Sequence, residues 1–448
     1  MKIIKTLAFI FLLCSNLQGQ DMTAQLDSIV NASYNDVGPG YAIQIDQNGE
    51  NLYRKSVGYA SLELDVPLRN DHIFRIGSIT KQFTAAAIIQ LEEVGKLTLD
   101  DPIETFIPDY PTLGKTITVE HLLTHTSGIK SYTSMKKFDA EFRKKDMTVL
   151  DLIDFFKNEP MDFDPGESFR YNNSGYILLG HIIEVLSGNT YAEYIQKNIF
   201  TPLGMKNSSY GDPMKLVKNR ASGYRRDNNE NIQNAAYMSM TLPYAAGSLL
   251  STTNDLSKWY HAVFSDKVIS KANREKAHST YVLNNGEETG YGYGWTIIDY
   301  EGNKVIQHGG GINGFSTSSA YIPSKNTFVT VLANCNCLSP TKLLQKLGAT
   351  AIGNPPTQTK KIDVPLAQLK QYEGDYKLSP KLTIHISVKD GKLLGVATGQ
   401  PEVELVPVDK HRFIVEAIDA KIEFNVDNKE VISLTLYQGG PHNAPKVK

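Results

Sequence analysis

Apolar and polar residues alternate in two stretches at opposite ends of one long region of the chain. Residues 40–60, "GYAIQIDQNGENLYRKSVGYA", alternate on both sides of Asn48-Gly49, which is a strong signal for a β-hairpin. Strand character returns between residues 291 and 335, in "YGYGWTII", "NKVIQHGGG", "FSTSSAYIP" and "NTFVTVLANC", with "PSKN" as the turn between the last two. We expect both stretches to supply strands of one sheet.

Helical periodicity dominates the region between these strands, to about residue 265. The segments "TVLDLIDFFKN" and "GYILLGHIIEVLSG" repeat apolar residues at helical spacing, and Thr190 with Glu193 forms a capping box for a further helix. The polar stretches 130–147 and 206–240 interrupt the pattern and are typical of loops or lids rather than core. Strands at both ends with helices between them predict an α+β domain, an antiparallel sheet packed against a helical lobe.

A second domain is predicted at the C-terminus. An apparent helix, "PTKLLQKLGATAIG", precedes "NPPTQTKK", which indicates a linker over residues 354–362. Short strands then recur at regular spacing, with Asp390-Gly391 as one of the turns. This pattern predicts a small all-β barrel or sandwich over residues 363–448, so the first domain covers residues 20–353.

The N-terminus has the pattern of a secretory signal. Lys2 and Lys5 precede an apolar stretch too short to span a bilayer, and Gly19 suits a cleavage site. Residues 1–19 are therefore predicted to be a signal peptide, and the protein to be exported to the periplasm or beyond the cell. Cys14 lacks the small preceding residue that lipid attachment usually needs, so we expect no lipoprotein anchor. No later apolar run is long enough for a transmembrane segment.

Composition narrows the range of partners. The 448 residues carry a formal charge of −2, so neither nucleic acid nor an anionic membrane is expected to bind, and the oligomeric state stays open. After the signal only Cys335 and Cys337 remain, at alternate positions of an expected strand. A bridge between such close neighbours would be strained, so we expect two buried free thiols. No zinc-binding pattern occurs, and no metal or organic cofactor is expected.

Ser78 and Lys81 are the first candidates for chemistry. They lie in "IGSITKQF", which opens a long apolar helix ending at Gly95, and residues three apart share one helix face. A serine becomes a nucleophile when a neighbouring base takes its proton, and a lysine can act as that base where burial disfavours its charged form. The same spacing occurs four times in the chain, and a capping serine followed by a solvated lysine is the simpler interpretation of any one pair. Only this pair opens a long apolar helix, where an unused lysine would be costly.

Two further groups of polar residues lie far from this pair in the sequence. "SFRYNNSGY" places Tyr171 and Asn173 just before a helix, where a tyrosine can act as acid or base and an asparagine amide can orient a substrate. "VIQHGGGINGF" places His308 on a strand that ends in three glycines, whose N–H groups could stabilise an oxyanion. In isolation each has a structural alternative: a polar turn with an aromatic anchor, and a bulged strand end with a hydrogen-bonded histidine.

Taken together and in this order, Ser78-x-x-Lys81, Tyr171-x-Asn173 and His308-x-Gly310 resemble the active-site motifs of the penicillin-binding proteins and serine β-lactamases. The Tyr-x-Asn form is similar to the class C β-lactamase branch with its DD-peptidase and esterase relatives. The resemblance covers residues 30–350 and includes the segments "HLLTHTSGI", "FDPGESFRYNNSGY", "PLGM" and "AAGSLLSTTNDLSKW". It implies a β-lactamase/transpeptidase-like domain followed by the small barrel-like C-terminal domain.

The resemblance also implies a role for each matched residue. Ser78 would be the acylated nucleophile and Lys81 its activating partner. Tyr171 would carry the proton to the leaving group, and Asn173 would orient the substrate. His125, in "HLLTHTSGI", matches no catalytic position and is expected to be structural.

The strand motif departs from the β-lactamase pattern. Class C β-lactamases carry a Lys-Thr-Gly triplet where this chain has His308-Gly309-Gly310, and the N–H groups of Gly311 and Ser78 would form the oxyanion hole. A histidine is only partly charged near pH 7 and a glycine has no hydroxyl, so recognition of a substrate carboxylate at this position is weakened. The departure puts efficient β-lactam hydrolysis in doubt. A triplet that begins with histidine is more similar to those of the family's DD-peptidases, D-amino-acid peptidases and esterases.

We therefore expect an exported serine hydrolase that acts through an acyl-enzyme on an ester or a D-amino-acid-type amide, in a small-molecule or peptide substrate. Turnover of β-lactams is expected to be weak. Two alternatives remain open at this point: a true class C-like β-lactamase, and a non-catalytic sensor or binding protein for cell-wall fragments.

Overall fold

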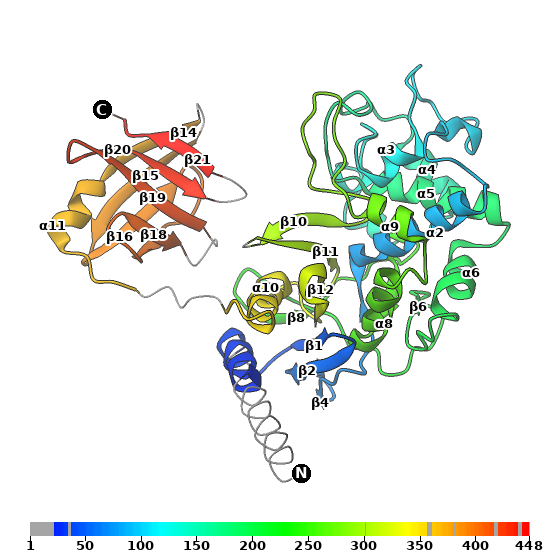
Figure 1. The fold of residues 1–448 in the computed structure, drawn as a ribbon, viewed down its shortest axis with the longest axis horizontal. Helices are drawn as coiled ribbons and strands as arrows, with labels where there is room; N and C mark the ends of the chain where they lie inside the picture. The colour runs from blue at the N-terminus through cyan, green and yellow to red at the C-terminus, as the bar shows by residue number, and fades with distance from the viewer. Residues whose placement is uncertain are drawn as a thin grey trace, which may run out of the picture. The chain divides into compact units, whose positions relative to one another are not determined.

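The computed structural model describes residues 22–34, 37–300, 302–355, 361–379, 382–415, 420–437 and 441–447. The predicted signal peptide, Cys14 and residues 356–360 of the predicted linker lie outside these ranges. The chain divides into two compact units, residues 1–355 and 356–448, and each is described by itself (Figure 1). Within the described ranges, no helix is long and apolar enough to cross a membrane.

The first unit is built on a six-stranded antiparallel sheet in the order β10-β11-β12-β13-β1-β2 (Figure 1). The two stretches of alternating residues meet where Tyr41 of β1 pairs with Ala333 of β13, which confirms the predicted sheet. Asn48 and Gly49 both adopt positive φ in the turn of the first hairpin, as a tight hairpin turn requires. The strands are β1 (Tyr41–Gln47), β2 (Glu50–Val57), β10 (Thr296–Tyr300), β11 (Asn303–Ile312), β12 (Phe315–Ile322) and β13 (Thr327–Ala333).

Both faces of this sheet are buried, because the central strands alternate between two apolar clusters. Phe328 and Leu332 of β13 pack on the side of Trp259 in α8 (Thr253–Phe264). Val329 and Val331 pack on the other side, where α10 (Pro340–Ala351) and a helical segment over residues 22–33 cover the sheet. The sheet is therefore covered by helices on both faces rather than by the helical lobe alone.

The helical lobe forms around α2 (Thr80–Glu93), a helix with eleven of its fourteen residues buried. A helix that is buried nearly all round belongs in the centre of a domain. α5 (Asn173–Ser187) packs beside it, and the Thr190–Glu193 capping box is present as predicted. The other helices of the lobe are α3 (Val119–Leu123), α4 (Val149–Phe156), α6 (Tyr191–Ile195), α7 (Tyr244–Gly247) and α9 (Lys271–Ala277).

Small sheets complete the first unit. The three-stranded one joins β5 (Phe74–Arg75), β9 (Leu249–Ser251) and β6 (Ser209–Tyr210), and so fixes the chain directly before Ser78. The others are two-stranded pairs, β3 (Tyr59–Ser61) with β4 (Val66–Pro67) and β7 (Tyr224–Arg226) with β8 (Ile232–Asn234).

Segment 130–147 does not have the solvent-exposed character that its polar composition suggested. Tyr132, Met135 and Phe138 are buried and belong to the main apolar cluster of the unit. The ring of Phe142 stacks on that of Phe155 with 4.1 Å between their centroids. Because the apolar residues are few and separated by lysines, composition concealed a segment that is anchored in the core.

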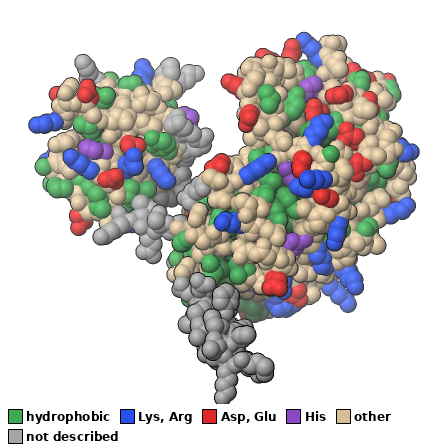
Figure 2. Space-filling view, viewed as in Figure 1, with side chains coloured by type: hydrophobic (Ala, Val, Ile, Leu, Met, Phe, Trp, Pro, Cys, Tyr) green, Lys and Arg blue, Asp and Glu red, His purple; other side chains and the backbone are tan. Residues whose placement is uncertain are grey.

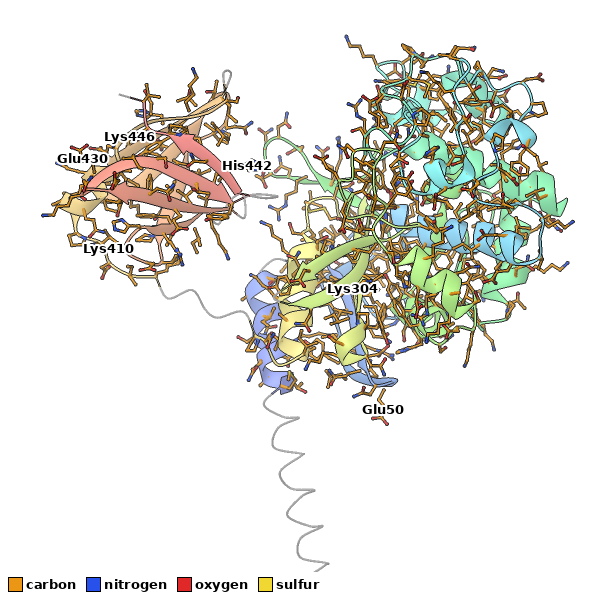
Figure 3. The ribbon with its side chains drawn as sticks, turned by 45° about the horizontal axis from the view of Figure 1, so that its top comes forward. Glu50, Lys304, Lys410, Glu430, His442 and Lys446 are labelled. Carbon is orange, nitrogen blue, oxygen red and sulfur yellow. A yellow bond between two sulfur atoms is a disulfide. The ribbon has the colours of Figure 1, made fainter. Side chains whose placement is uncertain are left out.

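The second unit is an all-β module, as predicted, and its eight strands follow one another in sequence order from β14 to β21 (Figure 1). A bridge between Tyr376 and Lys446 brings the two edges together, so the sheet is a nearly closed barrel (Figure 3). Its interior is an apolar cluster that includes Tyr372, Phe413 and Phe424. The strands are β14 (Gly374–Ser379), β15 (Leu382–Lys389), β16 (Lys392–Ala397), β17 (Val403–Pro407), β18 (Arg412–Val415), β19 (Ala420–Asp427), β20 (Glu430–Tyr437) and β21 (Pro441–Pro445), preceded by α11 (Leu366–Leu369).

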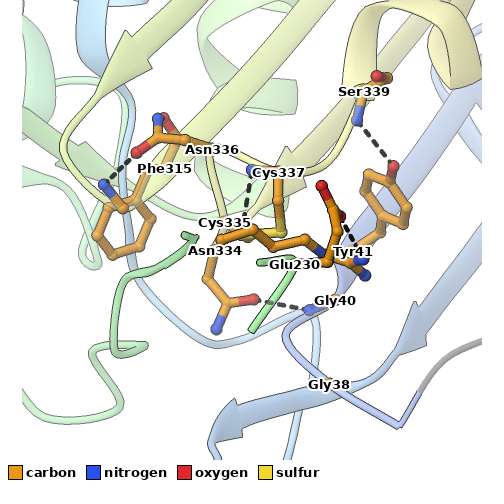
Figure 4. The surroundings of a disulfide bond; sticks show 12 residues. Gly38, Gly40, Tyr41, Glu230, Phe315, Asn334, Cys335, Asn336, Cys337 and Ser339 are labelled. Carbon is orange, nitrogen blue, oxygen red and sulfur yellow. Dashed lines mark hydrogen bonds and ion pairs between the residues drawn. A yellow bond between two sulfur atoms is a disulfide. The ribbon is translucent and has the colours of Figure 1, made fainter. Parts of the chain in front are cut away.

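The prediction of two free thiols is wrong. Cys335 and Cys337 form a disulfide, with 5.1 Å between their Cα atoms, a separation that disulfides commonly span (Figure 4). The prediction assumed that both cysteines lie in a strand. β13 ends at Ala333, and the chain turns at Asn336, which lets the two sulfur atoms meet.

Asn334 joins three segments of the first unit that are distant in the sequence. Its side chain is fully buried and accepts a hydrogen bond from the N–H of Gly40 at 2.8 Å (Figure 4). It also donates to the carbonyls of Tyr59 and Ser222 at 3.0 and 2.9 Å. Removing the amide would leave these main-chain groups without a partner.

We predict that Asn334→Ala lowers the free energy of unfolding of this unit by about 3 kcal/mol, because each unpaired buried polar group costs about 1–3 kcal/mol. Urea denaturation followed by tryptophan fluorescence measures this unit alone, since both tryptophans, Trp259 and Trp295, lie within it. A loss below about 1 kcal/mol would show that water replaces the amide and would contradict the prediction.

Candidate active site

Ser78 lies in a short 3-10 turn, Gly77–Ile79, directly before α2, rather than in the first turn of that helix. Gly77 adopts a positive φ of 53°, and a Cβ atom there would lie 3.0 Å from the main-chain nitrogen of Gly311. Both features require glycine at position 77. The close approach brings the turn that carries Ser78 against the end of β11.

Lys81 is fully buried at the start of α2 and faces Ser78. Its Nζ lies 3.4 Å from Ser78 Oγ, 2.8 Å from Asn173 Oδ1 and 2.9 Å from the carbonyl oxygen of Ala246. Ala246 belongs to the last turn of α7, where a helix leaves its carbonyl groups free. Within the part of the chain that the structure describes, Lys81 forms no ion pair with a carboxylate.

Burial without a counter-ion holds the pKa of Lys81 well below its ordinary 10.5, because desolvation disfavours the ammonium form. A neutral amine has two N–H groups and one lone pair. The oxygens of Asn173 and Ala246 can only accept hydrogen bonds, so they take the two N–H groups. The lone pair is left for the hydroxyl proton of Ser78, which is the arrangement that a base requires.

Asn172 and Asn173 begin α5 and connect Lys81 to segment 130–147. Asn172 caps the helix by accepting a hydrogen bond from the N–H of Gly175. Asn173, the first residue of the helix, accepts from Lys81 and donates through Nδ2 to Thr133 Oγ1 at 3.0 Å. The amide is therefore oriented by partners on both sides.

Tyr171 places its ring 4.8 Å from the Nζ of Lys81. The side chain is 38% exposed, yet desolvation of its hydroxyl raises the pKa of Tyr171, against the opposing effect of a hydrogen bond with Ser78. Because the pKa of Lys81 is lowered, the uncharged amine gives no electrostatic help to loss of the Tyr171 proton. Tyr171 is thus protonated, and it is suited to give a proton rather than to take one.

His308 is buried in β11 and hydrogen-bonded at both ring nitrogens. Nδ1 lies 2.6 Å from the carbonyl oxygen of Gly309, which can only accept, so Nδ1 carries the proton. Nε2 then accepts from the hydroxyl of Tyr291 at 2.9 Å. Desolvation, with the nearby Lys81, lowers the pKa of His308 to about 3, so the ring is neutral at physiological pH.

β11 does not end at its glycines but continues through them to Ile312. A Cβ atom on Gly310 would lie 2.0 Å from the carbonyl oxygen of Ile76 and 2.4 Å from Thr317 Oγ1. The glycine is needed so that this strand can lie against the turn of Ser78. The run of glycines predicted that some group approaches this backbone closely. In the structure that group is the chain segment directly before Ser78.

His125 is a buried histidine in contact with the catalytic candidates. Its ring packs on Tyr171, Tyr176 and Tyr291, with centroids 4.3, 5.1 and 4.7 Å away, and Nδ1 accepts from the N–H of Asn172 at 3.1 Å. Burial together with the nearby Lys81 keeps its pKa well below the ordinary value. These contacts support the structural role expected from the sequence.

A cavity of about 200 Å³ opens beside Ser78. Asn173 and Gly311 line it, whereas Lys81, Tyr171 and His308 do not. The sequence did not predict most of the wall, although segments 130–147 and 206–240, which were expected to be loops or lids, supply five of the lining residues. The remaining lining residues are Tyr132, Thr133, Phe138, Arg143, Met238, Pro243, Ala246, Gly247, Ile312 and Asn313.

Asn336, which lies between the two cysteines of the disulfide (Figure 4), holds the turn that contributes Ile312 and Asn313 to the cavity wall. Its Oδ1 accepts from the N–H of Gly314 at 2.6 Å, and its Nδ2 donates to the carbonyls of Ile312 and Phe315, both at 3.0 Å. The three bonds fix the β11–β12 turn just beyond Gly311. No signal in the sequence revealed this, because it depends on the turn between Cys335 and Cys337.

Acidic and basic side chains are interspersed on the face shown in Figure 2. No group of three or more His, Cys, Asp or Glu side chains that could hold a metal ion occurs in the described ranges.

A hydroxyl beside a buried amine of lowered pKa, next to strand glycines whose N–H groups can bind an oxyanion, is the arrangement of a serine hydrolase site. The comparison with known families agrees. The family model described as Beta-lactamase matches residues 28–343, more than half of the chain, and the protein belongs to this family. A second model, described only as a domain of unknown function, matches residues 358–446.

Named relatives are penicillin-binding proteins and amide hydrolases. Penicillin-binding protein 4* of Bacillus subtilis is 31% identical over 88% of this chain and 92% of its own length. The octameric penicillin-binding protein homologue from Pyrococcus abyssi superposes with a TM-score of 0.67 at 29% identity, over 99% of this chain and 100% of its own. A D-stereospecific amidohydrolase from Streptomyces sp. superposes with a TM-score of 0.62 at 25% identity, over 74% of this chain and 99% of its own chain.

The depressed pKa of Lys81 predicts how stability depends on pH. The unfolded chain binds one more proton than the folded one between the lowered pKa and 10.5, so the free energy of unfolding rises with pH in that window. Relative to that of Lys81→Met, the free energy of unfolding of the parent protein should increase by up to about 1.4 kcal/mol for each pH unit. Urea unfolding of both proteins at pH 7, 8 and 9 measures this. Equal slopes would mean that the lysine stays protonated in the fold.

The hydrogen bonds of Asn336 predict an effect on catalysis. Asn336→Ala frees the turn beyond Gly311, and misplaced oxyanion donors should lower kcat/KM for an ester by roughly tenfold or more. The matched control is Asn326→Ala, which alters the turn at the opposite end of β12. An Asn336→Ala enzyme with unchanged kcat/KM would contradict the positioning role.

Proposed function

We propose that this serine hydrolase is exported and cleaves an ester or a D-amino-acid-type amide through an acyl-enzyme on Ser78. The observation that carries the proposal is the Lys81 amine, buried without a counter-ion and 3.4 Å from Ser78 Oγ. Lys81 takes the hydroxyl proton while Oγ forms a bond to the substrate carbonyl carbon. The N–H groups of Ser78 and Gly311 stabilise the developing oxyanion.

Tyr171 completes the first half of the reaction. The bond from the carbonyl carbon to the leaving group breaks, and the leaving group takes the Tyr171 proton. The proton now on Lys81 restores the tyrosine. Water then attacks the acyl-enzyme, gives up its proton to the same pair, and releases the acid with Ser78 reprotonated.

Two observations support this substrate class over a β-lactam. The triplet position that is lysine in class C β-lactamases is His308, which is neutral, buried against Tyr291 and absent from the cavity wall. It supplies no positive charge for the carboxylate of a β-lactam. The similar protein from Streptomyces is a D-stereospecific amidohydrolase, which favours an amide or ester with a D-configured acyl group.

Export is supported by the pattern of residues 1–19 and by the disulfide between Cys335 and Cys337, since disulfides persist in oxidising compartments. The competing proposal is a non-catalytic sensor or binding protein, whose site binds cell-wall fragments without cleaving them. It predicts ligand binding without acylation of Ser78.

The test is hydrolysis of p-nitrophenyl acetate by the purified protein beside Ser78→Ala. We expect Ser78→Ala to lose at least about a thousandfold in kcat, because removal of a nucleophile abolishes acylation. Ser339→Ala is the matched control, since Ser339 and Lys342 have the same spacing and Ser339 makes no capping hydrogen bond. The rates at which the protein hydrolyses a D-amino acid amide and a cephalosporin are then compared to rank the substrate classes. Activity that survives in Ser78→Ala would overturn the proposal.

A further inference from the structure

The cavity beside Ser78 contains one permanently charged side chain, Arg143. No aspartate or glutamate is among the residues that line it. Lys81 lies behind Ser78, outside the wall of the cavity, and favours its uncharged form. An arginine carries its positive charge across the physiological pH range, so the cavity is electropositive when it is empty of substrate.

The guanidinium of Arg143 has no partner that neutralises it. Within the described ranges it forms neither an ion pair nor a hydrogen bond, and its Nε is shielded from solvent without an acceptor. Its Cζ lies 4.9 Å from the ring centroid of Phe138, so the planar group rests against an aromatic side chain. A half-buried arginine with unused donors is unusual unless a ligand supplies the acceptor.

The main chain around Arg143 is held in place on both sides. Its N–H donates to the carbonyl of Asp139 at 3.1 Å, and its carbonyl accepts from the N–H of Ser239 at 2.9 Å. The ring of the neighbouring Phe142 is stacked on that of Phe155, and both pack against the main apolar cluster of the unit. Because the main chain is fixed before a ligand arrives, binding would add no cost for ordering the backbone at this position.

We propose that Arg143 binds an anionic group on the acyl part of the substrate, so that the preferred acyl donor carries a carboxylate. The planar fork of an arginine matches a carboxylate through two parallel hydrogen bonds. This inference rests on the proposed function and deepens it by adding a charge to the substrate class.

The side of the substrate follows from where the proton donor lies. In the proposed reaction the leaving group faces Tyr171, and Tyr171 does not line the cavity that contains Arg143. The cavity therefore receives the part of the substrate that stays on Ser78. Phe138 and Met238 give it apolar walls for a short carbon chain between the scissile carbonyl and the charge. Its volume of about 200 Å³ suits a small acyl group.

Two esters of equal chain length test the proposal, mono-p-nitrophenyl glutarate with a terminal carboxylate and p-nitrophenyl valerate without one. We expect the ratio of kcat/KM for the anionic over the neutral ester to fall roughly tenfold to hundredfold in Arg143→Met, since hydrogen bonds to charged groups contribute about 1.5–3 kcal/mol. Arg143→Lys should recover part of the ratio. Lys144→Met is the matched control, because it removes an adjacent positive charge that is exposed and paired with Glu141.

An unchanged ratio in Arg143→Met, or an equal fall in Lys144→Met, would overturn the proposal. A far-UV circular dichroism spectrum that matches the parent protein shows that Arg143→Met is folded. Calorimetric titration of both esters into Ser78→Ala, with and without Arg143→Met, measures the same charge preference without turnover. If the hydrolase proposal is wrong, neither ester is cleaved. The calorimetric titration still shows whether Arg143 favours the anionic ester.

Discussion

The burial of one amine without a counter-ion is the constraint on which the rest of this site depends. A lysine ammonium in such a position is costly, and the fold lowers the cost by favouring the uncharged form rather than by supplying a carboxylate. Three elements from distant parts of the sequence meet around Lys81: the turn before α2, the first residue of α5 and the last turn of α7. Each offers an oxygen, and only that of Ser78 also carries a proton to give.

The same constraint explains the character of the neighbouring groups. An uncharged Lys81 leaves the phenol of Tyr171 protonated, so base and acid are separated between two side chains in contact. His308 and His125, both buried nearby, are neutral as well. These neighbouring groups are polar but carry no fixed charge, whereas the described residues that line the cavity beside Ser78 include one permanent positive charge, that of Arg143. Catalytic power and charge selectivity are in this way assigned to different residues.

The sequence predicted the groups that are tied to short motifs and missed those that depend on tertiary structure. Ser78, Lys81, Tyr171, Asn173 and the glycines of β11 lie in motifs whose residue types are unusual for their surroundings, and the structure brings them together. Hairpin and helix periodicity likewise predicted the sheet, the lobe and the all-β second unit. Arg143 and Thr133 lie in a segment whose lysines concealed its buried aromatic residues. Asn336 can hold the β11–β12 turn because the chain itself turns after β13, between the two cysteines of the disulfide. The alternating pattern of the sequence had instead suggested that the strand continues.

The most direct test of the account is the pH dependence of Ser78 phosphonylation by a fluorophosphonate, followed by the intact mass of the protein. A single chemical step at the serine then reports the protonation state of its base, without substrate binding or product release. If Lys81 is the base, the rate constant should reach its plateau well below pH 10 and fall only as the pH drops through the lowered pKa of Lys81. A rate that still rises roughly tenfold per pH unit up to about pH 10 would show an ordinary, protonated lysine and would contradict the account.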